Sequence, residues 1–396
     1  MRAPRCLTKR CGPLLVLVAA TTCGGNGNAA PATPIADASA IELSLLIVGD
    51  AGRPAEEGEP VLKALTTAAA VDPKRTLVLF LGDNVYADGL RPVGDPERAT
   101  GERRLGAQVD VLRQSGAPGI FVPGNHDWRS GWRAVVDQQR FIETHGNGLA
   151  SMVPGGGCPG PEIVDASASL RLVILDTAWW LFDGPKPMHP SSECEFDSEA
   201  EVLDATRRAL ADAGERHVVV VTHHPMDSGG RHGGHFAWHE HIFPLRGLHP
   251  WLWIPLPVLG SFYPLARMAG IADQDLTSDR YGSMRDRLRD VFRANPPLAN
   301  VAGHDHNLQV LEGAVETYVL VSGAGIYGHA TTVQQLEQTR FALNAAGFMR
   351  LDVLTDGTMR LAVLVVDETG GSREVFSTWL DDDERSASSG ATDEKK

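Results

Sequence analysis

The sequence predicts an α/β fold in which strands and helices alternate along a single long domain. Apolar, strand-like runs alternate with helix-like segments from about Ile41, and strands dominate residues 308–366. Several of the apolar runs end in a glycine followed by a polar cluster. An α/β sheet binds its ligands at the carboxyl ends of its strands. The pattern therefore predicts a site built from several strand ends.

The expected strands are short, apolar and rich in branched residues. They cover residues 43–48, 76–81, 119–122, 170–175, 217–222 and 298–302. Helices are expected at residues 60–71, 102–115, 198–213 and 279–294.

The composition is that of a globular protein with a sizeable core, with 43% hydrophobic and 22% charged residues. The net charge is −14, from 36 basic and 50 acidic residues. No Lys/Arg-rich block stands out beyond the N-terminus, which argues against nucleic acid as a structural partner. An acidic body repels anionic substrates, so such a substrate would need a local cationic site, for which bound metal is the obvious candidate.

The first 23 residues have the pattern of an export signal. Four cations precede an apolar run at residues 13–20, which is too short to span a bilayer; they are Arg2, Arg5, Lys9 and Arg10. Cys23 follows that run and resembles the acylated residue of a bacterial lipoprotein, with an ordinary cleaved signal and a chance cysteine as the alternative. We expect a periplasmic, secreted or lipid-anchored protein.

Beyond the signal the chain divides into a flexible linker at 24–40, a catalytic domain at 41–380 and an acidic disordered tail at 381–396. The domain carries an apolar insertion at about 246–275, whose residues 251–271 are broken by prolines. This stretch suits a lid, a protein contact, an interfacial membrane wedge or a loop folded onto the domain.

Cys158 and Cys194 are the two cysteines that remain in the body of the chain. In an oxidising compartment they could form a disulfide, and the alternative is two independent thiols.

Five polar clusters require a joint explanation. They are Gly49-Asp50-Ala51-Gly52, Gly82-Asp83-Asn84-Val85-Tyr86, Gly124-Asn125-His126-Asp127, Val220-Val221-Thr222-His223 and Gly303-His304-Asp305-His306. Carboxylate, phenolate, amide oxygen and imidazole together suit a first-row transition metal better than magnesium or calcium.

The order of these clusters resembles that of the purple acid phosphatases, a branch of the calcineurin-like metallophosphoesterases. The local sequence at residues 82–86, 303–309 and 322–325 is most similar to that of the small animal-type, tartrate-resistant form. The resemblance covers about residues 43–325. It implies a four-layer α-β-β-α sandwich with two metals at one rim of the strands.

Carried over by position, the resemblance implies a ligand set for each metal. Asp50, Tyr86 and His306 would hold the first metal. Asn125, His223 and His304 would hold the second, and Asp83 would bridge the two.

The first site departs from the wider superfamily, which usually places a histidine where this chain has Gly52. Tyr86 would fill that position. A phenol has a pKa near 10 and binds as phenolate only to a strongly acidic metal, so the exchange favours Fe(III) at the first site. The second site suits a divalent ion such as Fe, Zn or Mn.

The resemblance implies an exported acid phosphatase that hydrolyses phosphate monoesters through a hydroxide activated by two metals. His126 and His232 are expected to bind substrate or act as general acids, and Asp127 is expected to orient His126. Membrane association would run through a lipidated Cys23 or through residues 251–271. The alternatives are a phosphodiesterase or nucleotide hydrolase of the same superfamily, and a non-catalytic surface protein.

A further group of histidines, His235, His239 and His241, follows His232. These side chains either line the cleft or surface, which is the preferred interpretation, or form a second metal site.

Overall fold

The computed structural model describes residues 38–190, 192–247 and 251–380. The expected signal segment, Cys23, most of the expected linker and the acidic tail lie outside these residues. Within the described part of the chain, no helix has the length and apolar character needed to cross a membrane.

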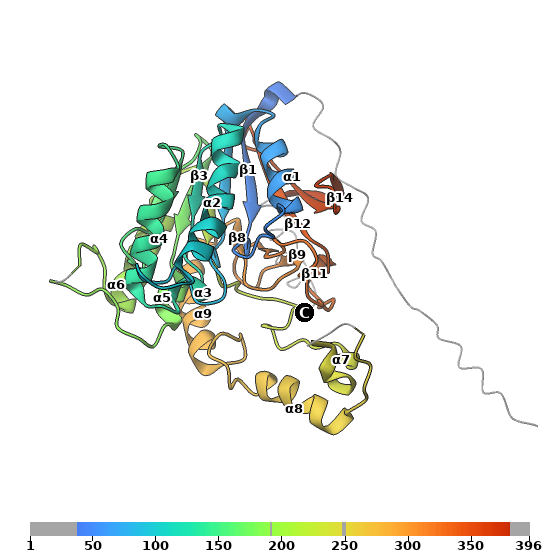
Figure 1. Ribbon diagram of the computed structural model, residues 1–396. Coiled ribbons are helices and arrows are strands. Elements are labelled where there is room, and N and C mark those ends of the chain that lie inside the picture. The colour runs from blue at the N-terminus through green and yellow to red at the C-terminus, as the bar shows by residue number, and fades with distance from the viewer. Residues whose placement is uncertain (1–37, 191, 248–250, 381–396) are drawn as a thin grey trace, which may run out of the picture. The chain divides into compact units, whose positions relative to one another are not determined.

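Two sheets of seven strands each lie at the centre of the described residues, as Figure 1 shows in part. In the first sheet the order is β14-β13-β12-β1-β2-β3-β4, and in the second it is β11-β9-β10-β8-β7-β6-β5. The first contains β1 (Ile41–Val48), β2 (Thr76–Phe80), β3 (Gly119–Phe121), β4 (Ala150–Met152), β12 (Gly347–Leu354), β13 (Met359–Val366) and β14 (Ser372–Leu380). The second contains β5 (Glu162–Asp165), β6 (Leu170–Ile174), β7 (His217–Val221), β8 (Ala299–Ala302), β9 (Leu308–Glu312), β10 (Tyr318–Ser322) and β11 (Thr339–Leu343).

Each sheet has a parallel half. Strands β1 to β4 pair in parallel in the first sheet, and β6, β7, β8 and β10 pair in parallel in the second. The last strands, β12 to β14, add an antiparallel half to the first sheet. The carboxyl ends of β1, β2, β3, β7 and β8 are the ends at which the five polar clusters follow.

Helices cover the outer faces of the two sheets. On the first sheet lie α1 (Pro60–Ala69), α2 (Arg98–Ser115) and α4 (Trp132–His145), which Figure 1 shows in front of β1 and β3. On the second lie α6 (Glu199–Ala211) and α9 (Asp279–Phe292), with the short α5 (Thr177–Leu181) beside α9. The remaining helices are α3 (Asn125–Trp128), α7 (Trp238–Ile242) and α8 (Pro257–Met268), with 3₁₀ turns η1 (Ala38–Ala40), η2 (Pro73–Arg75) and η3 (Pro244–Gly247). The expected α-β-β-α sandwich is confirmed.

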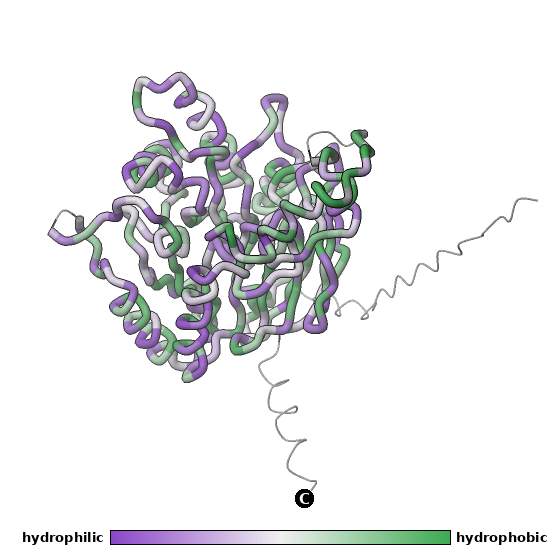
Figure 2. The backbone as a smooth tube through the Cα atoms, turned by 90° about the horizontal axis from the view of Figure 1, so that it is seen from below, coloured by the Kyte–Doolittle hydropathy of each residue, from purple (hydrophilic) through white to green (hydrophobic). Residues whose placement is uncertain are grey.

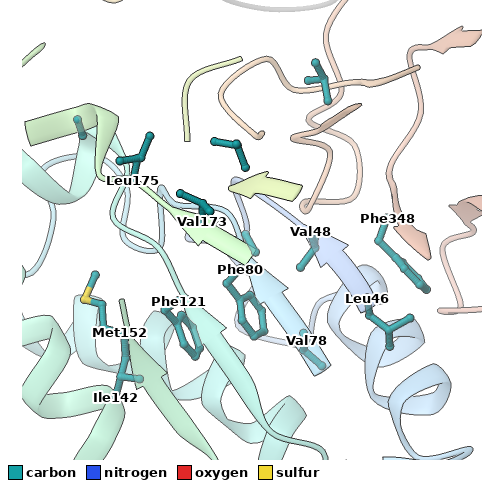
Figure 3. Close-up of a cluster of buried hydrophobic side chains, with 14 of the residues drawn as sticks. Leu46, Val48, Val78, Phe80, Phe121, Ile142, Met152, Val173, Leu175 and Phe348 are labelled. Atoms are coloured by element: carbon teal, nitrogen blue, oxygen red, sulfur yellow. The ribbon is translucent and has the colours of Figure 1, made fainter. Parts of the chain in front are cut away.

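The period-two alternation of strand side chains divides the core between the layers. Leu45 and Ile47 of β1 face the second sheet and pack in one cluster with its buried side chains, among them Leu172. Leu46 and Val48 face the other way and pack with the helices, and Figure 3 shows them in this cluster. Both faces of the parallel strands are therefore buried, so the strand ends have a fixed position.

A disulfide joins Cys158 and Cys194. It links the segment between β4 and β5 to the loop that precedes α6. Of the two alternatives that the sequence left open, the structure contains the covalent pair.

The proline-broken stretch contains a helix, α8. Pro257 lies in the first turn of α8, where a backbone N–H has no partner within the helix. Pro264 lies inside α8 and removes one internal hydrogen bond there. The helix packs against α7, and Figure 1 shows the two together, apart from the helices that cover the sheets.

Candidate metal centre

The seven candidate ligands come from both sheets. Asp50, Asp83 and Asn125 follow β1, β2 and β3, and His223 and His304 follow β7 and β8. Donor atoms of Asp50, Asp83 and His223 all lie within 4.8 Å of one another, although the two carboxylates follow strands of the first sheet and His223 follows a strand of the second. The structure therefore gathers the strand ends at one place.

Three of these residues have a left-handed backbone although none is a glycine. The φ angles are 60° at Asp50, 55° at Asp83 and 70° at His304. Such a conformation costs about 1–3 kcal/mol and is usually found where a side chain must be aimed at a functional site. At each of these strand ends the sharp turn points the side chain into the shared site.

The first group of candidate ligands is Asp50, Tyr86 and His306. The Tyr86 hydroxyl donates to Asp50 Oδ1 over 2.8 Å and lies 3.0 Å from His306 Nε2. His306 Nε2 lies 3.3 Å from Asp50 Oδ1. Burial, then the charges of Asp50 and Asp83, raise the pKa of Tyr86 well above its ordinary value, so the phenol keeps its proton unless a strong cation replaces it.

The second group is Asn125, His223 and His304. Asn125 Oδ1 lies 3.0 Å from His223 Nε2 and 3.1 Å from His304 Nδ1, and these two nitrogens are 3.2 Å apart. The other nitrogen of each ring donates to a backbone carbonyl, His223 Nδ1 to Leu81 over 2.8 Å and His304 Nε2 to Gln274 over 2.8 Å. These bonds fix both tautomers, as second partners of metal-binding histidines commonly do.

This second group tests whether the residues fit a metal. The two remaining ring nitrogens and Asn125 Oδ1 face one another at hydrogen-bond distance. Burial lowers the pKa of His223, but the charges of Asp83 and Asp50 outweigh it and raise this pKa above its usual value, so a positive charge is favoured at this place. Burial and the neighbouring His232, His224 and His223 lower the pKa of His304 well below its usual value, so its ring is neutral. Two ring nitrogens and an amide oxygen that converge where positive charge is favoured form a donor set that fits a metal ion.

Asp83 lies between the two groups. Its Oδ1 is 3.5 Å from His223 Nε2 and accepts the backbone N–H of His126 over 2.8 Å. Burial raises the pKa of Asp83, but the nearby His223 and His126 outweigh it and hold the carboxyl below its ordinary value. An ionised carboxylate in this position is suited to contact two cations at once.

Gly52 stands where the superfamily usually has a histidine, and the structure shows why no side chain fits there. A Cβ at Gly52 would lie 2.3 Å from the carbonyl oxygen of Asp83 and 2.5 Å from the backbone nitrogen of Val85. The backbones instead bond directly, Gly52 N–H to Asp83 O over 3.0 Å and Tyr86 N–H to Gly52 O over 3.2 Å. The close approach of the Gly52 backbone to the loop that carries Tyr86 therefore accounts for both the missing histidine and the position of Tyr86.

Two candidate outer histidines flank the site. The Nε2 of His126 is 3.8 Å from Asp83 Oδ2, and its Nδ1 contacts the carbonyl of Ala87. His232 packs its ring against His304, with ring centroids 3.8 Å apart, and its Nδ1 is 2.9 Å from Asp275 Oδ1. Both line a cavity of about 480 Å³ that also contains Asp83, Asn125, His304 and His306.

Asp127 does not orient His126, so that expectation was wrong. It is fully buried and accepts backbone N–H groups from Asn84 over 3.1 Å, Val85 over 3.0 Å and Gly124 over 2.8 Å. Asp127 therefore fastens the loop after β2 to the loop after β3. Because Asp127 directly follows His126, the sequence suggested the imidazole as its partner. In the structure its carboxylate instead accepts the backbone N–H of Gly124, three residues earlier, as an acidic residue at this position of a helix start commonly does.

Ring nitrogens of His223, His224 and His304 lie within 4.8 Å of one another, so His224 borders the second group. Its Nδ1 is 2.8 Å from Thr177 Oγ1 and its Nε2 is 2.8 Å from Gln274 Oε1, so both nitrogens already have partners. Among the described residues, no cluster of three His, Cys, Asp or Glu side chains able to hold a metal includes His235, His239 or His241.

Sequence reasoning missed Gln274, Asp275 and Arg267, which support His232 and His304. Arg267 Nε donates to Asp275 Oδ2 over 2.7 Å, and Asp275 is completely buried. These residues lie within the insertion, where no motif marks them.

Comparison with known proteins agrees with this geometry. The calcineurin-like phosphoesterase family matches residues 43–247, just over half of the chain. Comparison with curated proteins gives no significant match. The fold is similar to GAP50, described as the anchor in the inner membrane complex of Plasmodium, with 14% identity and a TM-score of 0.53, covering 86% of this chain and 89% of that one.

It is also similar to the purple acid phosphatase PPD1 from yellow lupin (Lupinus luteus) seeds, with 14% identity and a TM-score of 0.50. That likeness covers 85% of this chain and 53% of the lupin chain, so this chain spans about half of its length. At such identities both likenesses concern the fold alone.

Proposed function

Because this chain belongs to the calcineurin-like phosphoesterase family, we propose that it is an exported, metal-dependent acid phosphatase that hydrolyses phosphate monoesters. The observation that carries the proposal is the pair of three-residue groups with Asp83 between them. Such a pair is the arrangement that the animal-type, tartrate-resistant purple acid phosphatases would need, and it arises here from residues of both sheets.

In this proposal Asp50, Tyr86 and His306 hold Fe(III), and Asn125, His223 and His304 hold a divalent Fe, Zn or Mn ion. Two such ions lower the pKa of water and stabilise the oxygens of a phosphoryl group as they gain charge. Asp50, Asp83 and a Tyr86 phenolate would together contribute three negative charges against five positive ones. The local excess of positive charge would attract a phosphate dianion despite the net charge of −14.

The chain's own histidines would bind the substrate and supply a proton to the leaving oxygen. His126 and His232 support this role because both line the cavity that contains the candidate ligands. Asp275 Oδ1 and Arg267 Nη2 both lie 2.9 Å from His232 Nδ1, so the opposite nitrogen of that ring is left for the substrate.

Export is supported by the basic and apolar pattern of residues 1–23 and by the Cys158–Cys194 disulfide, which suits an oxidising compartment. The protein would be periplasmic, secreted or attached to a membrane through a lipidated Cys23. Residues 251–271 offer a second membrane contact because their helix exposes apolar side chains.

A non-catalytic role is the second candidate, and the likeness to GAP50, an anchor protein, favours it because it covers most of both chains. The site argues for catalysis, since all seven candidate ligand positions are filled and converge. A phosphodiesterase or nucleotide hydrolase would use the same metal ligands. Only the substrates that the protein cleaves distinguish these activities from that of a monoesterase.

The test is a substrate panel with the metal-loaded full chain at acidic to neutral pH, comparing phosphate monoesters with diesters. We expect monoesters to be cleaved with the higher kcat/KM. His304→Ala should abolish turnover while the fold is retained, and His145→Ala, at an exposed position on α4, should leave it unchanged.

Three results would count against the proposal in different ways. Comparable cleavage of diesters would make the monoesterase assignment wrong. A fully active His304→Ala variant would overturn the metal site. A folded, metal-loaded chain that cleaves neither class would favour the non-catalytic role.

A further inference from the structure

The segment from α7 to α8 lies beside the candidate metal centre and is unusually apolar at its surface. Figure 2 shows green stretches along the tube in this part of the chain. Most of the large hydrophobic side chains that are exposed in the described residues belong to it: Trp238, Trp251, Trp253, Ile254, Val258, Leu259, Phe262, Tyr263, Leu265 and Met268. Exposed apolar side chains are unfavourable in water, and a concentration of them in one segment is typical of a surface that binds a ligand or a partner.

Two cavities meet at this segment. The first, of about 480 Å³, contains the candidate ligands and reaches Tyr263 and Arg267 of α8. The second, of about 630 Å³, lies between α7, α8 and the loop at residues 328–332. His306 and Tyr263 line both cavities, so the second adjoins the first at these two side chains.

Aromatic and proline side chains of the segment form one wall of the second cavity. They are Phe236, Phe243, Tyr263 and Pro264. Arg231 and Glu240, which also line this cavity, are paired with each other, since Arg231 Nη2 lies 2.5 Å from Glu240 Oε1, and Glu240 also accepts from Thr332 over 3.1 Å. The remaining titratable side chains of the lining are the phenol of Tyr263 and the imidazoles of His239, His306 and His329. With the charges of Arg231 and Glu240 neutralised, the wall favours an uncharged, ring-bearing guest over an ionic one.

The wall is held in place before any guest arrives. The Tyr263 hydroxyl accepts from Arg267 Nη1 over 2.8 Å, and Arg267 in turn bonds the buried Asp275. The rings of Phe236 and Tyr263 pack edge to face with centroids 6.1 Å apart. Ordering a preformed wall costs little on binding, which is a requirement for a selective subsite.

We propose that the second cavity is a leaving-group subsite, so that the preferred substrates are phosphate monoesters of bulky alcohols that carry an aromatic ring. The phosphoryl group would lie in the first cavity, and the alcohol would pass His306 and Tyr263 to stack in the second. This inference rests on the proposed function for the identity of the anchored group, but the subsite can be tested without turnover.

The experiment measures the dissociation constants of 3-phenylpropylphosphonate and n-propylphosphonate for the metal-loaded full chain by calorimetry. The two ligands share one anionic group and differ only in the ring. We expect the phenyl ligand to bind about tenfold more tightly or better. Tyr263→Ala and Phe243→Ala should each remove most of this preference.

Phe262→Ala is the matched control, because Phe262 neighbours Tyr263 on α8, is 77% exposed and lines neither cavity. It should retain the full preference. Equal binding of the two ligands to the wild type would overturn the subsite, and so would a loss in Phe262→Ala equal to that in Tyr263→Ala. A preserved preference in a chain that cleaves no monoester would instead contradict the proposed catalysis and leave the subsite supported.

Discussion

Single side chains at the candidate metal centre are held by bonds that leave their remaining polar atoms facing inward. The backbone carbonyls of Leu81 and Gln274 each accept a hydrogen bond from one imidazole, and the other ring nitrogens of His223 and His304 then face Asn125. Backbone partners of this kind cannot rotate away as a side chain can. The site is therefore organised by the fold before a metal arrives.

Tyr86→Phe tests the proposed tyrosinate at the first metal. The wild-type protein loaded with iron and zinc should show a visible absorption band from charge transfer between Tyr86 and Fe(III). The variant should lose that band and keep the fold, because the removed hydroxyl contacts side chains of the site, Asp50, His306 and Asp83. A visible spectrum and far-ultraviolet circular dichroism check both statements. An unchanged band in the variant would assign the colour to another ligand.

Asp275→Asn tests the buried pair behind His232. Burial raises the pKa of Asp275, but Arg267 and His232 outweigh it and lower this pKa below its ordinary value of 3.8. The stabilising charge is therefore complete above about pH 3.8 and is lost as the pH falls through the lower folded-state pKa. The variant should be less stable by about 3 kcal/mol near pH 6, because removal of one partner leaves Arg267 buried without its carboxylate.

Urea unfolding at several pH values measures this effect. The difference between wild type and variant should narrow as the pH falls below about 4, where the wild-type carboxyl also takes up a proton. A difference that stays constant over that range would show that the ionised carboxylate is not the source of the stability.

At the scale of helices and strands, the strands that carry the site could be predicted from the sequence. The helices and the supporting side chains next to the site could not. The expected strand at residues 76–81 is β2 (Thr76–Phe80), and the one at 217–222 is β7 (His217–Val221). Buried parallel strands have a strong signature of continuous apolar residues ending at a glycine or a polar turn. The polar clusters could be found for the same reason.

The helices next to the site were harder to predict. Helix α4 (Trp132–His145) was not predicted, and α8 was hidden by Pro257 and Pro264, which ordinarily argue against a helix. Support from residues distant in sequence, such as that of Asp275 for His232, depends on tertiary contacts that have no local pattern. The crowding at Gly52 likewise becomes visible only when the loop after β2 is seen against it.

The disulfide joins two loops that are not connected by strand pairing. It spans 36 residues of sequence, between the loop before β5 and the loop before α6. Cys158→Ser with Cys194→Ser should lower the free energy of unfolding by about 2–5 kcal/mol, since the unfolded chain regains the freedom of that loop. Urea unfolding of the double variant under oxidising conditions measures the loss. If the wild type and the double variant unfold at the same urea concentration, the bridge contributes nothing to stability.

At the scale of the whole molecule, the site forms only where the two sheets meet. Asp50, Asp83 and Asn125 follow strands of the first sheet, and His223 and His304 follow strands of the second. A metal held by both sets joins the sheets, so it should bind the folded domain and not the unfolded chain. Metal binding and global stability are therefore linked.

Removing the metals should lower the melting temperature of the whole domain. A ligand present at 1,000 times its dissociation constant stabilises the folded state by about 4 kcal/mol, and the loss should amount to several degrees in Tm. Calorimetry before and after treatment with a chelator measures it, and added metal should restore the original value. A Tm that chelation leaves unchanged would mean that no metal connects the two sheets.

The most direct test of the account is the metal content of the purified full chain, determined by elemental analysis after loading with iron and zinc and removal of the excess. About two ions per chain are predicted for the wild type. About one is predicted for His306→Ala, which disrupts the first group, and for His304→Ala, which disrupts the second. A wild type that retains no metal, or variants that both keep two ions, would contradict the assignment of these residues to a two-metal centre.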